Sequence, residues 1–91
     1  MISNLLAVLL TREVHIDNFQ FQPQVLQVRV GTRVSWINRD DMPHSVVGPG
    51  SKFRSELLDT DGQYSYVFTR PGTYPYFCGL HPHMTGKIVV K

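Results

Sequence analysis

Four side chains with metal-binding atoms lie in two parts of this sequence. Cys78, His81 and Met84 fall within one short stretch, Cys-Gly-Leu-His-Pro-His-Met, and His44 lies well upstream of it. Together they supply a thiolate, two imidazoles and a thioether, which is the donor set of a type 1 copper site. Sulfur ligands favour Cu(I) and imidazole suits both oxidation states, so this set predicts one copper ion that exchanges single electrons.

The second imidazole could come from any of three histidines besides His81. His44 follows an expected strand over residues 34–38, at a strand end from which a loop can reach the cysteine. We expect the ring of His83 to face solvent, because it must clear the neighbouring methionine, and His15 lies on the polar side of an alternating segment. We therefore predict the following ligands: His44, Cys78, His81 and Met84.

Composition limits the class of protein. The chain has 91 residues, of which 42% are hydrophobic and 18% charged, with a formal net charge of +2. We therefore expect one domain over residues 1–91, a monomer without affinity for nucleic acid. The apolar run at 5–10 is far shorter than the roughly 20 residues that span a bilayer, and residues 1–10 receive no assigned role. The single cysteine excludes an intramolecular disulfide framework and a cysteine-rich zinc module.

The hydrophobic pattern predicts an all-β protein. From about residue 12 onward, apolar and polar residues alternate in short runs, which is typical of half-buried strands. Gly and Pro occur between these runs, where turns require them. We therefore expect a Greek-key β-sandwich or barrel of about seven to eight strands. The stretch 51–58 is the only candidate for a helix, of one or two turns.

The ligand segments resemble those of a known family. Residues 34–44, Val-Ser-Trp-Ile-Asn-Arg-Asp-Asp-Met-Pro-His, look like the strand and loop that carry the first histidine ligand in amicyanin, a cupredoxin or blue copper protein. Residues 72–90 resemble its ligand loop and last strand, with the same two-residue gaps on either side of His81. The resemblance covers about residues 12–91, although the interval from His44 to Cys78 is shorter than in amicyanin. It implies a cupredoxin-like sandwich with a type 1 copper ion at one end, shuttling electrons between redox proteins such as c-type cytochromes or periplasmic dehydrogenases.

The resemblance also bears on the surroundings of the ligands. Ser45 stands where cupredoxins commonly place an asparagine that ties the two ligand loops together, so we expect a looser connection here. We expect an apolar docking patch around the ring edge of His81, formed by neighbours from both loops: Met42, Pro43, Leu80 and Pro82.

We expect an electron carrier and not an enzyme, and three other functions fit the sequence less well. A fragment of a multicopper oxidase or nitrite reductase would need further copper ligands, and only His81-Pro82-His83 has the required His-x-His form. A copper carrier or storage module would use similar ligands, but a thiolate with an axial methionine fits redox work better. A metal-free β-sandwich would leave the four donors unexplained. Because Cu(II) bound to a thiolate survives where reducing thiols are absent, we expect a periplasmic or other extracytoplasmic location.

Overall fold

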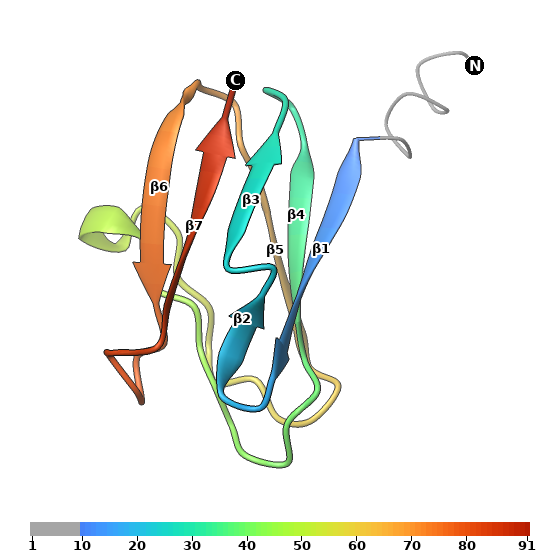
Figure 1. Cartoon of the computed structure of the whole chain (residues 1–91), viewed down its shortest axis with the longest axis vertical. Coiled ribbons are helices and arrows are strands. Elements are labelled where there is room, and N and C mark those ends of the chain that lie inside the picture. Colours follow the sequence, from blue (N-terminus) through green and yellow to red (C-terminus); the bar gives the residue numbers. More distant parts are fainter. Residues whose placement is uncertain (1–9) are drawn as a thin grey trace.

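The protein is described by a computed structural model over residues 10–91. In this part of the chain the regular structure is almost entirely strand (Figure 1). In chain order the elements are β1 (Thr11–Asp17), β2 (Gln20–Gln22), β3 (Val25–Val28), β4 (Arg33–Asn38), the 3₁₀ turn η1 (Pro49–Ser51), β5 (Gln63–Val67), β6 (Gly72–Phe77) and β7 (Thr85–Val90). The predicted all-β class is confirmed. Residues 1–9, most of the N-terminal segment that received no role, lie outside the described residues.

The strands form two sheets that face each other across the core. One sheet has the order β2-β1-β4-β5 and the other the order β3-β7-β6. β1 pairs in parallel with β4, so both strands end at the same end of the molecule, the lower end in Figure 1. The β1–β2 turn and the loop after β4 therefore lie near each other. The β6–β7 loop joins them there, because Val47 pairs with Phe77 at the end of β6.

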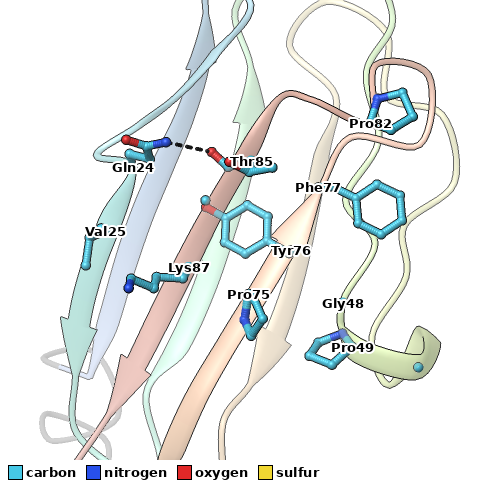
Figure 2. A pocket seen from close by; sticks show the side chains of 12 residues that line it. Gln24, Val25, Gly48, Pro49, Pro75, Tyr76, Phe77, Pro82, Thr85 and Lys87 are labelled. Carbon is cyan, nitrogen blue, oxygen red and sulfur yellow. Dashed lines mark hydrogen bonds between the residues drawn. The ribbon is translucent and has the colours of Figure 1, made fainter.

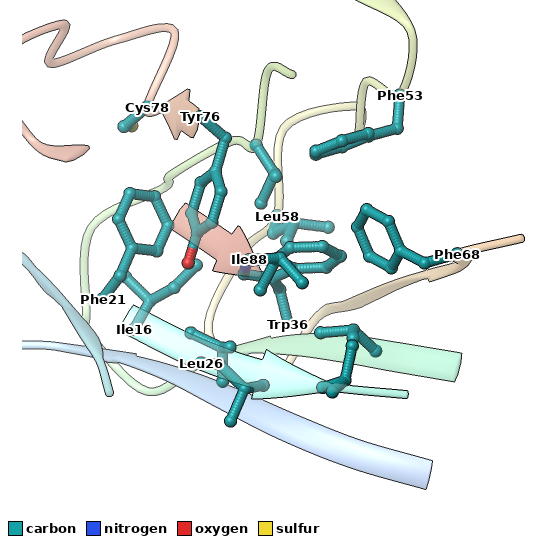
Figure 3. Packing of buried hydrophobic residues seen from close by; sticks show 14 of the residues in the cluster. Ile16, Phe21, Leu26, Trp36, Phe53, Leu58, Phe68, Tyr76, Cys78 and Ile88 are labelled. Carbon is teal, nitrogen blue, oxygen red and sulfur yellow. The ribbon is translucent and has the colours of Figure 1, made fainter. Parts of the chain in front are cut away.

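The core between the sheets is aromatic. Trp36 is fully buried, and its ring lies 5.7 Å from that of Phe53 and 5.3 Å from that of Tyr76 (Figure 3). Burial raises the pKa of the Tyr76 phenol to about 12, because the apolar surroundings disfavour its charged form. Cys78, also fully buried, belongs to the same cluster and follows Tyr76 at the end of β6. The thiol thus lies where the core meets the loops.

The expected helix over residues 51–58 is wrong. Only η1, a single 3₁₀ turn, occurs in this region, and Gly50 and Ser51 within it have positive φ angles. The backbone of the following residues bonds across to the segment after β4 instead of to its own preceding turn. Ser55 donates its N–H to Val46, and Leu58 donates to His44. Pairing with a distant segment therefore replaces the local hydrogen bonds of a helix.

No helix within residues 10–91 has the length and apolar character needed to cross a membrane.

Candidate metal centre

Three of the predicted ligand side chains meet at one end of the sandwich. The Sγ atom of Cys78 lies 3.6 Å from Nδ1 of His44 and 3.7 Å from Nδ1 of His81. All three donor atoms lie within 4.8 Å of one another. His44 and Cys78 are fully buried, whereas His81 is partly exposed. Two of the three donors therefore lie in the core, and the imidazole of His81 reaches the surface.

The loop between β6 and β7 is folded tightly on itself. The N–H of His81 donates to the carbonyl of Cys78 at 3.1 Å, and the N–H of Met84 donates to the carbonyl of His81 at 2.8 Å. The N–H of Cys78 in turn donates to the carbonyl of Met84 at 3.0 Å. Met84 is 5% exposed and belongs to the buried cluster that contains Cys78. The short spacing of the motif thus brings three potential donors into one loop whose backbone is closed by its own hydrogen bonds.

The spacing of the three donor atoms fits one metal ion. For metal–ligand bonds of about 2.0–2.3 Å, as known for zinc, three donors in a plane around an ion lie about 3.5–4.0 Å apart. The two measured sulfur–nitrogen separations of 3.6 and 3.7 Å fall in this range. One sulfur and two imidazole nitrogens with a nearby methionine are the donors of a type 1 copper site.

His44 is fixed by the strand that precedes it. Asn38, the last residue of β4, is fully buried and donates its amide Nδ2 to the carbonyls of Met42 at 2.9 Å and Leu58 at 2.8 Å. His44 itself forms a two-way backbone pairing with Leu58. On the ring, Nε2 lies 2.8 Å from Oδ2 of Asp40, a residue that is only 8% exposed. The backbone of His44 is therefore held by Leu58, and its ring is held by Asp40 at the nitrogen that faces away from the cluster.

Ser45 connects the two ligand loops. Its hydroxyl oxygen accepts the N–H of Gly79 at 2.9 Å, and its own N–H points to Sγ of Cys78 at 3.4 Å. Both bonds join the segment after β4 to the β6–β7 loop. Serine has fewer donors than asparagine, but this link requires an acceptor on the side chain, and the hydroxyl supplies one. A Cβ on Gly79 would lie 2.8 Å from this oxygen, so glycine permits the close approach of the loops.

We predict that a Ser45→Ala variant loses about 1 kcal/mol of unfolding free energy, because the Gly79 N–H loses its acceptor in a partly buried place. Denaturant unfolding followed by fluorescence measures this loss. Ser65→Ala is the matched control. Its hydroxyl bonds only the Ser35 hydroxyl in an exposed place, and we expect a change below about 0.5 kcal/mol. Equal losses in the two variants would show that the loop connection contributes nothing.

A hollow on the β3–β7–β6 sheet is separate from this cluster. It is lined by residues of β6 and β7, among them Tyr76 and Phe77, by Pro49 of η1 and by Pro82 of the β6–β7 loop (Figure 2). None of the three clustered donors lines it. The metal centre is therefore built into the end of the sandwich and does not lie in this hollow.

Comparison with known proteins identifies a family of copper-binding proteins. Residues 8–91 match the family described as copper binding proteins, plastocyanin/azurin family. The chain belongs to this family. It is 39% identical over 84 residues to amicyanin-alpha from Methylorubrum extorquens. The aligned region covers 87% of this chain and 71% of that protein. It is 39% identical over 83 residues to amicyanin from Paracoccus denitrificans, covering 86% of this chain and 63% of that one. The chain thus spans about two thirds of the length of these relatives.

Solved structures of cupredoxins have the same fold. A purple cupredoxin from Nitrosopumilus maritimus superimposes with a TM-score of 0.84 at 29% identity, over 88% of this chain and 99% of that one. A Cu(I) structure of an amicyanin mutant gives a TM-score of 0.81 at 36% identity, over 89% of this chain and 82% of that one. Together with the donor spacing, these likenesses confirm the cupredoxin-like fold and the copper cofactor predicted from the sequence. His44, Cys78, His81 and Met84 are arranged as a type 1 copper site.

Two of the expected docking residues, Leu80 and Pro82, flank the partly exposed His81 in the chain, and the other two, Met42 and Pro43, directly precede His44. Met42 and Leu80 are each 48% exposed, and Pro82 is also exposed, whereas Pro43 is half-buried.

The two histidines set aside in the sequence lie apart from the donor cluster. His83 is exposed. His15 is partly exposed and pairs with Glu13 at 3.0 Å.

Sequence reasoning missed two residues beside the ligands. Asp40 bonds the ring of His44, and the ring of Phe19 lies edge-on to both imidazoles, at 5.2 Å from His44 and 5.3 Å from His81. A signal for Asp40 was present, since metal-binding histidines usually donate their second nitrogen to a carboxylate or carbonyl, and this aspartate lies four residues before His44. Nothing in the sequence separated Phe19 from an ordinary turn residue.

Proposed function

We propose that this chain is a one-electron carrier rather than an enzyme, with copper bound by His44, Cys78, His81 and Met84. The observation that carries the proposal is the convergence of one thiol sulfur and two imidazole nitrogens within 4.8 Å, beside the buried Met84. Copper bound by these residues supplies the exchange between Cu(II) and Cu(I). His44, Cys78 and His81 would hold the ion, and the thioether of the buried Met84 would supply a further, weaker donor.

The contribution of the protein is to hold the ligands still. His44 is fixed through Asp40 and Leu58, and the loop from Cys78 to Met84 is closed by its own backbone hydrogen bonds. Ser45 joins the two segments. Ligands held in this way have little freedom to rearrange when the charge of the ion changes, which favours rapid electron transfer.

We propose that electrons enter and leave through the exposed edge of His81. The surrounding side chains form an apolar docking patch, defined as Met42, Pro43, Leu80 and Pro82. Small interfaces suit brief encounters between redox proteins. We infer that the partners are redox proteins such as c-type cytochromes or periplasmic dehydrogenases. An extracytoplasmic location fits this role, since reducing thiol pools are absent there.

A Leu80→Glu substitution tests the docking patch. We expect reduction by a partner protein to slow about tenfold or more, because a charge must be desolvated in an apolar contact, while the visible spectrum stays unchanged. Stopped-flow kinetics with a c-type cytochrome measures the rate. The matched control is Val25→Glu, which also replaces an exposed apolar side chain by a carboxylate, at a 52% exposed residue of β3. An altered spectrum at an unchanged rate, or equal slowing in the control, would contradict the patch.

Titration of the protein with Cu(II) tests the proposed function. We expect one copper per chain, with an intense absorption at about 600 nm that ascorbate bleaches and reoxidation restores. Stoichiometry above one would favour a multicopper enzyme. Tight binding without the absorption, or without reversible bleaching, would favour a copper carrier or storage module.

A further inference from the structure

A buried carboxylate lies behind the copper cluster. Asp40 is 8% exposed, and both of its carboxylate oxygens accept hydrogen bonds. Oδ1 accepts the N–H of Asn18 at 2.7 Å, and Oδ2 accepts the N–H of Phe19 at 2.9 Å. Oδ2 also lies 2.8 Å from Nε2 of the fully buried His44. A buried charge requires this many partners, so the site is built around an ionised aspartate.

The ionised state of Asp40 decides which nitrogen of His44 carries the proton. An ionised carboxylate can only accept, so Nε2 of His44 must be the donor. Nδ1 is then unprotonated, and its lone pair faces Cys78 across 3.6 Å.

We propose that Asp40 is a positioning residue for the copper site: it selects the His44 tautomer that can bind the ion, and its fixed negative charge favours Cu(II) over Cu(I). This inference rests on the proposed function. The charge lies next to a buried imidazole, where water screens it little. It therefore shifts the reduction potential more than a surface carboxylate does. A negative charge stabilises the more positive oxidation state and so lowers the reduction potential.

The same carboxylate also holds the turn that carries an aromatic ring in contact with both imidazoles. Asn18 and Phe19 have φ angles of 54° and 58°, the left-handed region that non-glycine residues rarely adopt. The two bonds from their N–H groups to Asp40 stabilise this turn. The turn places the ring of Phe19 nearly perpendicular to the rings of His44 and His81, with centroids 5.2 and 5.3 Å away. Asp40 therefore connects the orientation of His44 to the ring that contacts both imidazoles.

An Asp40→Asn variant separates charge from shape. The amide has the size of the carboxylate but no charge and a single acceptor oxygen, so at least one of the three donors loses its partner. We expect the Cu(I)/Cu(II) ratio at a fixed solution potential to rise about tenfold or more, which corresponds to a rise of about 59 mV in reduction potential. Redox titration of the copper-loaded protein, followed by the visible absorption, measures this change.

Asp41→Asn is the matched control. It removes the same charge from the next residue of the same loop, where the side chain is exposed, and we expect a ratio within about twofold of wild type. We also expect the amide protons of Asn18 and Phe19 to exchange with solvent at least about tenfold faster in Asp40→Asn than in Asp41→Asn. Equal potentials in the two variants, or unchanged amide exchange, would overturn the role of Asp40.

A measurement on the wild-type protein keeps the inference testable if Asp40→Asn does not fold. In the Cu(I) form, which is suited to NMR, the Nε2 proton of His44 should be a downfield, slowly exchanging signal. The Nε2 proton of His81, a partly exposed ring, should exchange rapidly and serves as the internal reference. Rapid exchange at His44 would overturn the inference. A wild-type protein without the visible copper absorption would instead refute the proposed function, so the two failures are distinguishable.

Discussion

A Cys78→Ser variant should fold as the wild-type protein does, yet lose the intense visible absorption of the copper-loaded form. The absorption arises from the bond between the thiolate and Cu(II), and a hydroxyl oxygen cannot replace it. Copper affinity should fall by more than the roughly 10–100-fold typical of substitutions outside the ligand set. Within residues 10–91, no other histidine, cysteine or carboxylate donor joins this cluster, so the sulfur has no ready replacement. Absorption spectroscopy and competition with a copper chelator measure both effects.

His83→Ala is the control for this experiment. His83 is in the same loop but exposed, so we expect the variant to keep the absorption and to bind copper within about threefold of wild type. Retention of the absorption in Cys78→Ser, or its loss in His83→Ala, would contradict the ligand assignment.

A Trp36→Ala variant should lose about 3–5 kcal/mol of unfolding free energy. Trp36 is fully buried and packs against four aromatic rings, so its removal leaves a cavity that β-strands from two sheets cannot close. The free energy of unfolding of a small domain is only about 5–15 kcal/mol, so the variant should be near the limit of stability. Denaturant unfolding measured by circular dichroism tests this.

Leu57→Ala is the control for the core prediction. The side chain of Leu57 is 59% exposed, so its truncation should change the unfolding free energy by less than about 0.5 kcal/mol. Comparable losses in the two variants would mean that the aromatic cluster is not the main source of stability.

The parts of the site that are local in sequence could be predicted, because their geometry follows from short spacing. The interval from Cys78 to Met84 requires a tight loop between two strands, and period-two alternation indicated those strands. His44 was chosen because the loop lacked one imidazole, and the structure places its ring beside the loop. The class of fold followed from the same alternation and from turns at regular intervals.

The parts that depend on long-range contacts could not be predicted. Asp40 bonds the amides of Asn18 and Phe19, more than twenty positions away, and no pattern in either segment indicates this contact. The stretch 51–58 was wrongly expected to be helical because its backbone partners are residues 44–48, which local composition does not show. The link between Ser45 and Gly79 is of the same kind, because it joins residues 34 positions apart through an acceptor oxygen on the serine.

X-ray absorption spectroscopy of the copper-loaded protein, in both oxidation states, tests the central claim most directly. The claim is that one sulfur and two imidazole nitrogens from two held segments bind a single ion with little rearrangement. We expect one short copper–sulfur and two copper–nitrogen contacts in the oxidised protein, nearly unchanged after reduction. A first shell without sulfur, a second copper atom nearby, or a large change of ligands on reduction would contradict it.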